Sequence, residues 1–300
     1  MASSPSKNVR QNEAQSDALR NDADLIARIE AAIYKGSKGA ERFREYMPSL
    51  LRRATDAVID GPGTGRFTID ELEKTEKTYL GTKVEILLRS WLELPKGNFL
   101  DLLIDGIEVD IKNTMASNWM IPAEAIGHPC LLVKTSEKLS RFSIGIVVAR
   151  DEHLSAGKNR DGKRAISAQG RDHIHWVLRD QPYPENIWSG LDPELRKKIV
   201  SYPPGTKRVA ALFRLVQQKP ISRVQVVTMA PQRDGMKRLR KNGGARDSLA
   251  HEGIAILSGC FDKTLIGRLN LPRSKNDEFI SYQPQTESDK ALLRSLGKID

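Results

Sequence analysis

Cysteine is scarce in this chain of 300 residues, which contains only Cys130 and Cys260. Two cysteines can form neither a disulfide scaffold nor a cysteine-rich zinc site, and such scarcity is typical of a reducing compartment. Long apolar runs are also missing, since none reaches the roughly 18 residues that a membrane helix needs. Residues 1–7 lack the basic and then apolar layout of a secretory signal. The sequence therefore predicts a soluble protein without a membrane partner.

Three short segments contain only part of a known kind of site. Residues 61–65 are rich in glycine but lack the Lys-Ser/Thr of a phosphate loop, so we expect no nucleotide cofactor. His173 and His175 alternate on a predicted strand, without the further ligands that a zinc site needs. Cys130 has no identifiable base or orienting partner, and we expect it to be buried.

The composition is that of an ordinary globular protein. Apolar residues make up 39% of the chain and charged residues 29%, which argues against wholesale disorder. A length of 300 residues favours two domains, although one large domain is also compatible with it.

Positive charge is concentrated in the C-terminal part of the chain. Residues 1–180 contain 27 basic and 26 acidic side chains, whereas residues 181–300 contain 21 and 12. Between Arg196 and Arg246 there are 14 basic residues and a single acid, Asp234. Apolar positions are interleaved with these charges, so the region should be folded. A folded basic module most often binds nucleic acid, and the alternative is a basic surface that is merely solvated.

The sequence QPYPEN at 181–186 is typical of a linker, and together with the shift in charge at this point it divides the chain into two domains. We expect a flexible tail over residues 1–20, a first domain over 21–180, a linker over 181–190 and a second domain over 191–300. Helices are predicted at 23–33, 43–59, 83–93, 195–202 and 209–218, and a loop at 60–66. Strands are predicted at 99–104, 107–112, 130–135, 142–149 and 173–178, with a basic, glycine-rich loop at 157–164. This mixture of elements indicates an α/β or α+β fold.

Two opposed carboxylates are predicted on one hairpin. Asp105-Gly106 is a strong two-residue turn signal between the strands at 99–104 and 107–112. Such a turn pairs residue 104 with 107, and therefore pairs Asp101 with Asp110. Residues that lie directly opposite each other in an antiparallel pair point to the same face of the sheet. Lys112, two positions further on, shares that face.

Opposed carboxylates repel each other unless a cation lies between them. Mg²⁺ is the natural candidate, because it prefers oxygen ligands and binds through one or two carboxylates plus substrate phosphate. The Lys112 ammonium could then hold an attacking water or stabilise negative charge on the phosphate. The alternative is that these residues simply face solvent, as we expect for Glu108. A register slip of one residue would also remove the pairing.

Glu85 is a third acid that could join this pair. It borders the apolar stripe of the helix at 83–93, which includes Val84, Leu88 and Leu92. It could therefore lean over a neighbouring sheet. The alternative is a capping box, in which Glu85 reaches back to the backbone of Thr82.

A helical Glu85, a strand Asp101 and the sequence Asp110-Ile-Lys112 resemble the layout of PD-(D/E)XK nucleases, although Leu100 stands where proline is usual. Longer strings resemble the restriction endonuclease NaeI family more specifically. These strings are YLGTKVE at 79–85, GNFLD at 97–101, VDIKNT at 109–114 and GGARDSLAHEG at 243–253. They occur in both halves, so the resemblance covers most of the chain from about residue 20.

The resemblance implies an N-terminal nuclease domain with a mixed sheet flanked by helices, and a C-terminal winged-helix domain. It implies a bacterial, cytoplasmic, homodimeric and Mg²⁺-dependent type II restriction endonuclease of double-stranded DNA. Its target would be a GC-rich palindrome such as GCCGGC, and a second DNA site bound to the C-terminal domain would activate cleavage. Glu85, Asp101 and Asp110 would be the metal ligands, and Lys112 the catalytic lysine.

DNA contacts are expected from both domains. In the second domain, a helix at 245–252, the Gly243-Gly244 break and a strand at 254–257 fit a helix-turn-helix with a wing. Its candidate phosphate contacts are Arg233, Lys237, Arg238, Arg240, Lys241 and Arg246. The candidates near the cut are Asn113, Thr114, Ser117 and Asn118. Trp119 fits a core or dimer contact better.

Two other functions are compatible with these features. One is a winged-helix regulator that binds DNA and carries an inert nuclease domain. The other is an enzyme that nicks DNA or changes its topology. Residues 58–61, VIDG, resemble the Lys-x-Asp-Gly adenylation motif of DNA ligases, but Val58 replaces the lysine. Without an amine no covalent nucleotide adduct can form there, so we predict no ligation.

Overall fold

The computed structural model describes residues 7–230 and 234–300, which form two compact units. The first unit contains the chain up to Ala54 and the segment Lys74–Glu185, and the second contains Thr55–Glu73 and Asn186–Asp300. The predicted first domain therefore differs from the first unit, because residues 55–73 belong to the second. None of the described helices is long and apolar enough to span a membrane.

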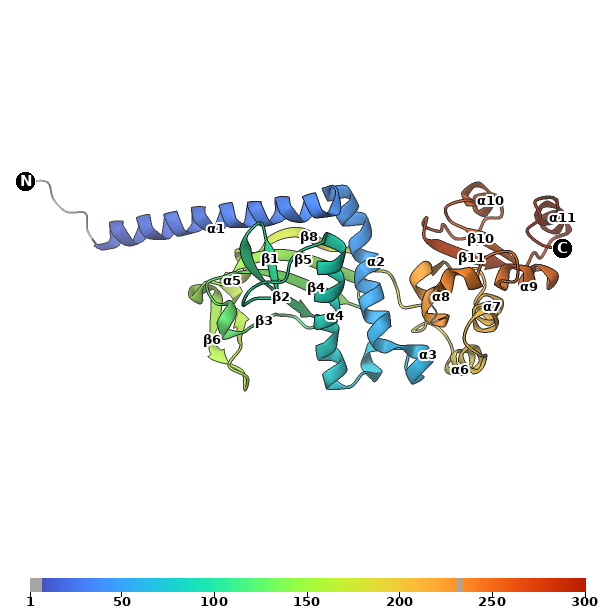
Figure 1. Ribbon diagram of the computed structural model, residues 1–300, viewed down its shortest axis with the longest axis horizontal. Coiled ribbons are helices and arrows are strands. Elements are labelled where there is room, and N and C mark those ends of the chain that lie inside the picture. The colour runs from blue at the N-terminus through green and yellow to red at the C-terminus, as the bar shows by residue number, and fades with distance from the viewer. Residues whose placement is uncertain (1–6, 231–233) are drawn as a thin grey trace, which may run out of the picture. The chain divides into compact units, whose positions relative to one another are not determined.

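A five-stranded mixed sheet forms the centre of the first unit (Figure 1). Its strand order is β1-β2-β4-β5-β8, and only β2 and β4 run parallel to each other. The strands are β1 (Leu102–Ile104), β2 (Ile107–Thr114), β4 (Pro129–Ser136), β5 (Arg141–Val148) and β8 (His175–Pro182). Helices pack against this sheet, so the predicted mixed sheet flanked by helices is confirmed.

Helix α4 (Lys74–Leu92) contacts β2, and α1 (Lys7–Ser37) contacts both α4 and β5. Leu80, Val84, Leu88 and Leu92 of α4 are buried at intervals of four residues, as a one-faced helix requires. Helix α4 begins nine residues before the predicted start, because its first turns carry few apolar side chains.

Residues 7–20 are helical and do not form the predicted tail. Their sequence is polar and has no apolar period, which is why the helix was not predicted, but it also lacks glycine and proline. Residues 1–6 lie outside the described part of the chain.

A small three-stranded sheet covers the opposite face of the main sheet from α4. Its order is β3-β7-β6, with β3 (Met120–Ile121), β6 (Leu154–Lys158) and β7 (Arg164–Ile166). Ile121, Leu154 and Ile166 share a buried cluster with Cys130 and Leu132 of the main sheet. Trp119 belongs to the same cluster and donates from its indole nitrogen to the carbonyl of Val133 at 2.9 Å. Its predicted core position is therefore confirmed.

Two predicted segments of the first 180 residues have a different local structure. The loop at 60–66 contains the one-turn helix α3 (Gly61–Thr64), which follows directly on α2 (Ala40–Ile59). Val58, in α2, is buried and apolar, so the segment that resembles a ligase motif offers no amine. The strand predicted at 173–178 begins at His175, because the short helix α5 (Ala168–Asp172) ends at His173. The two histidines therefore do not share a strand.

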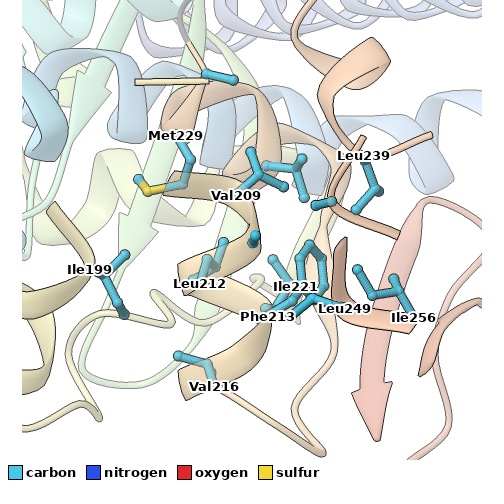
Figure 2. Packing of buried hydrophobic residues seen from close by; sticks show 14 of the residues in the cluster. Ile199, Val209, Leu212, Phe213, Val216, Ile221, Met229, Leu239, Leu249 and Ile256 are labelled. Atoms are coloured by element: carbon cyan, nitrogen blue, oxygen red, sulfur yellow. The ribbon is translucent and has the colours of Figure 1, made fainter. Parts of the chain in front are cut away.

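The second unit combines helices with the three-stranded antiparallel sheet β10-β11-β9. After residue 185 its elements in chain order are α6 (Pro193–Ser201), α7 (Thr206–Leu215), β9 (Ile221–Ser222), α8 (Arg223–Met229), η4 (Gly235–Arg238), α9 (Ala245–His251), β10 (Ala255–Ser258), α10 (Lys263–Arg268), β11 (Glu278–Tyr282) and α11 (Glu287–Ser295). The helices predicted at 195–202, 209–218 and 245–252 are present as α6, α7 and α9, and the strand predicted at 254–257 is present as β10. Figure 2 shows the core that α7, α8, α9 and β10 bury between them.

The segment 55–73 is held in the second unit by Phe67. The ring of Phe67 lies 5.1 Å from that of Trp188, and its carbonyl accepts a hydrogen bond of 2.6 Å from the Asn186 side chain. Both Asn186 and Trp188 are buried, although they fall within the linker predicted at 181–190. The residues of that segment therefore take part in folded structure, as Gln181 and Pro182 do in β8.

Candidate active site

The predicted hairpin is present in the predicted register. Ile104 pairs with Ile107 and Leu102 with Val109, which brings Asp101 opposite Asp110. Asp105 and Gly106 have φ angles of 49° and 75°, the positive values that a tight two-residue hairpin turn requires. Local turn chemistry therefore positions the two carboxylates.

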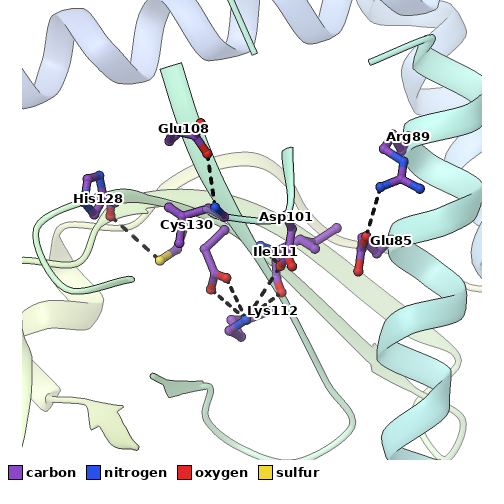
Figure 3. A network of polar contacts seen from close by, with 10 residues as sticks. Glu85, Arg89, Asp101, Glu108, Ile111, Lys112, His128 and Cys130 are labelled. Carbon is purple, nitrogen blue, oxygen red and sulfur yellow. Dashed lines mark hydrogen bonds and ion pairs between the residues drawn. The ribbon is translucent and has the colours of Figure 1, made fainter. Parts of the chain in front are cut away.

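Lys112 lies between these carboxylates (Figure 3). Its Nζ donates a hydrogen bond of 2.8 Å to Asp110 Oδ1 and lies 2.7 Å from Oδ2 of the same group. The distance from Nζ to Asp101 Oδ2 is 3.7 Å, and that oxygen also accepts 2.9 Å from the backbone amide of Ile111. The three predicted side chains thus form one connected network, with a cation between two acids.

Asp110 is the most buried member of this network, with 5% of its side chain exposed. Burial raises the pKa of Asp110 to about 6, since it outweighs the opposite effect of the Lys112 ammonium, and the nearby Asp101 adds to the rise. The ionised form of a buried carboxylate is stabilised by any further cation that approaches it. The position is therefore suited to bind positive charge.

Glu85 reaches the same region from α4. Its carboxylate lies 3.5 Å from the guanidinium of Arg89, one turn further along the helix, and 19% of its side chain is exposed. Burial raises the pKa of Glu85, and the negative charge of Asp101 raises it further. The capping-box alternative is wrong, because Thr82 lies in the middle of α4 and does not begin it.

Glu108 holds the loop before Asp101 in place, which the sequence did not reveal. Its Oε1 accepts 2.8 Å from the amide of Asn98 and 2.7 Å from the Asn98 side chain, and its Oε2 accepts 3.1 Å from the amide of Leu100. Desolvation opposes ionisation of Glu108, but these backbone donors leave its pKa below the ordinary value. Glu108 therefore fastens the loop that ends at Asp101, whereas the sequence predicted a side chain that simply faces solvent.

The donor set suits a hard divalent cation. Carboxylate oxygens of Asp101, Asp110 and Glu85 are the ligands that Mg²⁺ prefers, and the buried Oδ2 of Asp110 already lies 2.7 Å from a positive charge, the Lys112 ammonium. Nevertheless, no three acidic, histidine or cysteine side chains within residues 7–230 and 234–300 are grouped as a ready-made metal site. The Lys112 ammonium lies where the two aspartates would share a metal, so binding a metal requires this side chain to move.

Cys130 is the register partner of Asp110 on the neighbouring strand β4. The thiol is buried, and this burial together with the negative charge of Asp110 raises its pKa. It is therefore not a nucleophile at neutral pH, as the sequence predicted for a buried cysteine.

The end of β2 and the loop that follows it contain the four side chains expected to contact DNA near the cut. Both polar atoms of the Asn118 side chain have hydrogen-bond partners. Its nitrogen donates 2.7 Å to the carbonyl of Ile166, and its oxygen accepts 2.9 Å from the amide of Trp119. Thr114 accepts from the amide of Ala116 and donates to the carbonyl of Asn118. Ser117 is exposed. The amide oxygen of Asn113 is buried without a hydrogen-bond partner, so Ser117 is the most accessible of the four.

The cations expected to bind phosphate in the second unit differ in exposure. Lys237, Arg240 and Lys241 are exposed, whereas Arg238 is half-buried. The guanidinium of Arg246 lies 5.9 Å from the ring of Phe279, and burial lowers its pKa. Arg233 lies outside the described residues.

Comparison with known proteins agrees with this geometry. The family model described as restriction endonuclease NaeI matches residues 36–289. The chain belongs to the NaeI restriction endonuclease family. It is 34% identical over 278 residues to a protein named type II restriction enzyme NaeI from Lentzea aerocolonigenes, and the match covers 89% of this chain and 86% of that relative. The predicted family and enzyme class, a type II restriction endonuclease, are therefore confirmed.

Proposed function

We propose that this member of the NaeI family cleaves double-stranded DNA at a specific site in a Mg²⁺-dependent reaction. The single observation that carries the proposal is the network of Asp101, Asp110 and Lys112, which Glu85 approaches from α4. An inert nuclease domain would have no need to keep a buried carboxylate beside a lysine, because such groups destabilise a fold unless they are fully paired.

Each residue of the network has a defined task in this hydrolysis. A water oxygen attacks phosphorus in line, the opposite P–O bond breaks, and the departing oxygen takes up a proton. Asp101 and Asp110, with Glu85, would hold Mg²⁺, which when bound supplies positive charge beside the phosphate. The Lys112 ammonium would orient the water or stabilise the negative charge that develops on the phosphate oxygens.

The second unit supports a winged-helix assignment. The order α7-β9-α8-η4-α9-β10-α10-β11, in which β10 and β11 pair although α10 lies between them in the chain, is compatible with a helix-turn-helix followed by a wing. The turn before α9 is tight, because a Cβ on Gly244 would lie 2.0 Å from the carbonyl oxygen of Arg240. On this assignment the exposed Lys237, Arg240 and Lys241 would contact the phosphates of a second, activating DNA site.

A two-fold symmetric homodimer would match a palindromic target, which on the family resemblance is GC-rich. The same resemblance gives a bacterial cytoplasmic location.

Digestion of a long sequenced plasmid tests this function. With Mg²⁺ we expect linear fragments whose mapped ends share one palindromic sequence, and with EDTA we expect none. Intact plasmid under all conditions would instead favour the DNA-binding regulator. Products cut in one strand only, or altered in topology without cutting, would favour the nicking or topology-changing enzyme.

A further inference from the structure

The hairpin between β6 and β7 is an exposed basic feature that the catalytic network does not use. Lys158 and Arg160 are exposed on it and Lys163 is half-buried, while Asp161 is the one acid of the tip. None of these three cations forms an ion pair with a described acid. Their positive charge is therefore available to a partner.

The tip is held in a defined conformation. The side-chain oxygen of Asn159 accepts 3.0 Å from the amide of Asp161 and 2.8 Å from that of Lys163, and the Asn159 amide donates 2.9 Å to the Lys163 carbonyl. Gly162 completes the turn with a φ of 75°. The cations are therefore presented on a preorganised backbone, so binding of a partner costs little conformational entropy.

The base of the hairpin is equally well fixed by Arg164. Its guanidinium donates 2.5 Å to Asp151 Oδ1, and its Nε donates 2.6 Å to the carbonyl of Ser155. The Arg164 side chain is therefore already engaged within the protein. The cations available to a partner are Lys158, Arg160 and Lys163.

The hairpin extends from the layer that covers the catalytic face of the sheet. Asp110 and Lys112 are register partners of Cys130 and Leu132, whose side chains pack against the small sheet. In addition, the Asn118 side chain donates 2.7 Å to the carbonyl of Ile166 in β7. The strand that leads to the tip is thus bonded to the loop that follows Lys112.

We infer that Lys158, Arg160 and Lys163 form a phosphate-binding clamp for the duplex being cleaved. This inference rests on the proposed endonuclease function, and it adds a DNA-binding element within the nuclease unit. A lipid surface fits less well, because the tip residues Asn159, Arg160, Asp161 and Gly162 include no apolar side chain. Phosphate contacts of this kind position a duplex without reading its sequence.

The test compares two triple variants with the wild-type protein. The first is K158A/R160A/K163A. The matched control is K35A/R42A/K138A, which removes three exposed cations of the same unit and leaves the hairpin unchanged. Binding of a labelled duplex is measured by fluorescence anisotropy without divalent metal over a series of salt concentrations, and thermal melting verifies that both variants fold.

We expect the hairpin variant to bind at least about tenfold more weakly at low salt. Its plot of log affinity against log salt should be less steep by about 0.9 for each DNA phosphate that the variant no longer neutralises. The control should match wild type in both quantities.

An unchanged affinity and salt slope in the hairpin variant, or an equal weakening in the control, would overturn the inference. Absence of cleavage by the wild-type protein would refute the endonuclease proposal instead, since the binding assay does not depend on cutting.

Discussion

At the scale of single residues, Lys112 holds together two carboxylates that would otherwise repel each other. Its Nζ lies 2.7 Å from Asp110 and 3.7 Å from Asp101. The same ammonium is the only catalytic cation that the proposal assigns to the chain itself. Changing this side chain should therefore lower the cleavage rate without weakening DNA binding.

We predict that Lys112→Ala lowers the single-turnover cleavage rate by about 10²-fold or more, because the reacting phosphate then lacks a preorganised positive charge. Duplex binding should persist, since the exposed cations elsewhere are intact. Quenched-flow cleavage and anisotropy measure the two quantities, with Lys138→Ala, an exposed cation on a distant turn, as the control. A Lys112→Ala enzyme that cuts at the wild-type rate would show that the lysine has no catalytic task.

Glu108 is predicted to be a positioning residue for Asp101. Glu108→Ala removes three hydrogen bonds from the loop before Asp101, so that carboxylate should be held less firmly. We expect about a tenfold lower maximal cleavage rate and a higher Mg²⁺ concentration for half-maximal activity, with an unchanged KM for DNA. Glu108→Gln retains one acceptor oxygen, so its cleavage rate and its Mg²⁺ requirement should lie between those of wild type and those of Glu108→Ala. Equal rates and Mg²⁺ dependence in wild type and Glu108→Ala would argue against this role.

At the scale of secondary-structure elements, α7 and the end of α9 are joined by a bidentate ion pair. Arg214 donates 2.6 Å and 2.5 Å to the two carboxylate oxygens of Glu252. These hydrogen bonds lower the pKa of Glu252 below its ordinary value, although desolvation opposes them. A group whose folded pKa is lowered contributes stability above its unfolded pKa, about 4.3, and loses it as the pH falls through the folded value.

Glu252→Gln should therefore lower the free energy of unfolding by at most about 1 kcal/mol at pH 7, because both partners are about one-third exposed. The difference from wild type should become smaller as the pH is lowered from 7 to 3, because the carboxylate is then progressively protonated. Urea unfolding followed by circular dichroism at both pH values measures this, with the more exposed Glu194→Gln as the control. A difference that persists unchanged at pH 3 would contradict the assigned ion pair.

Elements set by local sequence could be predicted, and those set by distant contacts could not. The Asp105-Gly106 turn fixes the hairpin register over a few residues, so the opposition of Asp101 and Asp110 follows directly. The role of Glu108 depends on backbone amides eight and ten residues away, which no side-chain pattern marks. The helical start of α1 was missed because its polar sequence has no apolar period. The hydrogen bond from the Asn186 side chain to the carbonyl of Phe67 joins residues that are 119 positions apart, and no local sequence pattern can indicate it.

At the scale of the whole molecule, the chain passes between its two units three times, since residues 55–73 belong to the second unit and interrupt the first. Helix α2 contributes residues to both units. On the proposed activation by a second DNA site, this shared helix would be the covalent link through which the basic surface of the second unit influences the nuclease site of the first.

We predict that a duplex oligonucleotide carrying the mapped site accelerates cleavage of a plasmid that carries that site once. In a K237E/R240E variant the ratio of stimulated to unstimulated rate should fall close to one, because phosphate contacts of the second unit are replaced by repulsion. Initial rates at increasing oligonucleotide concentration measure this ratio. A variant that is stimulated as strongly as wild type would show that the basic surface does not bind the activating DNA.

The central claim is that the acidic pair beside Lys112 cleaves DNA with a divalent metal. It is tested most directly by measuring cleavage of supercoiled plasmid by wild type and Asp110→Asn across a range of Mg²⁺ concentrations. The substitution keeps the size of the side chain and removes the charge of the most buried metal ligand. We predict Mg²⁺-dependent linear product from wild type and at least about a 10²-fold lower rate from Asp110→Asn, with duplex binding retained. Cleavage by Asp110→Asn at the wild-type rate and with the same Mg²⁺ dependence would contradict the claim.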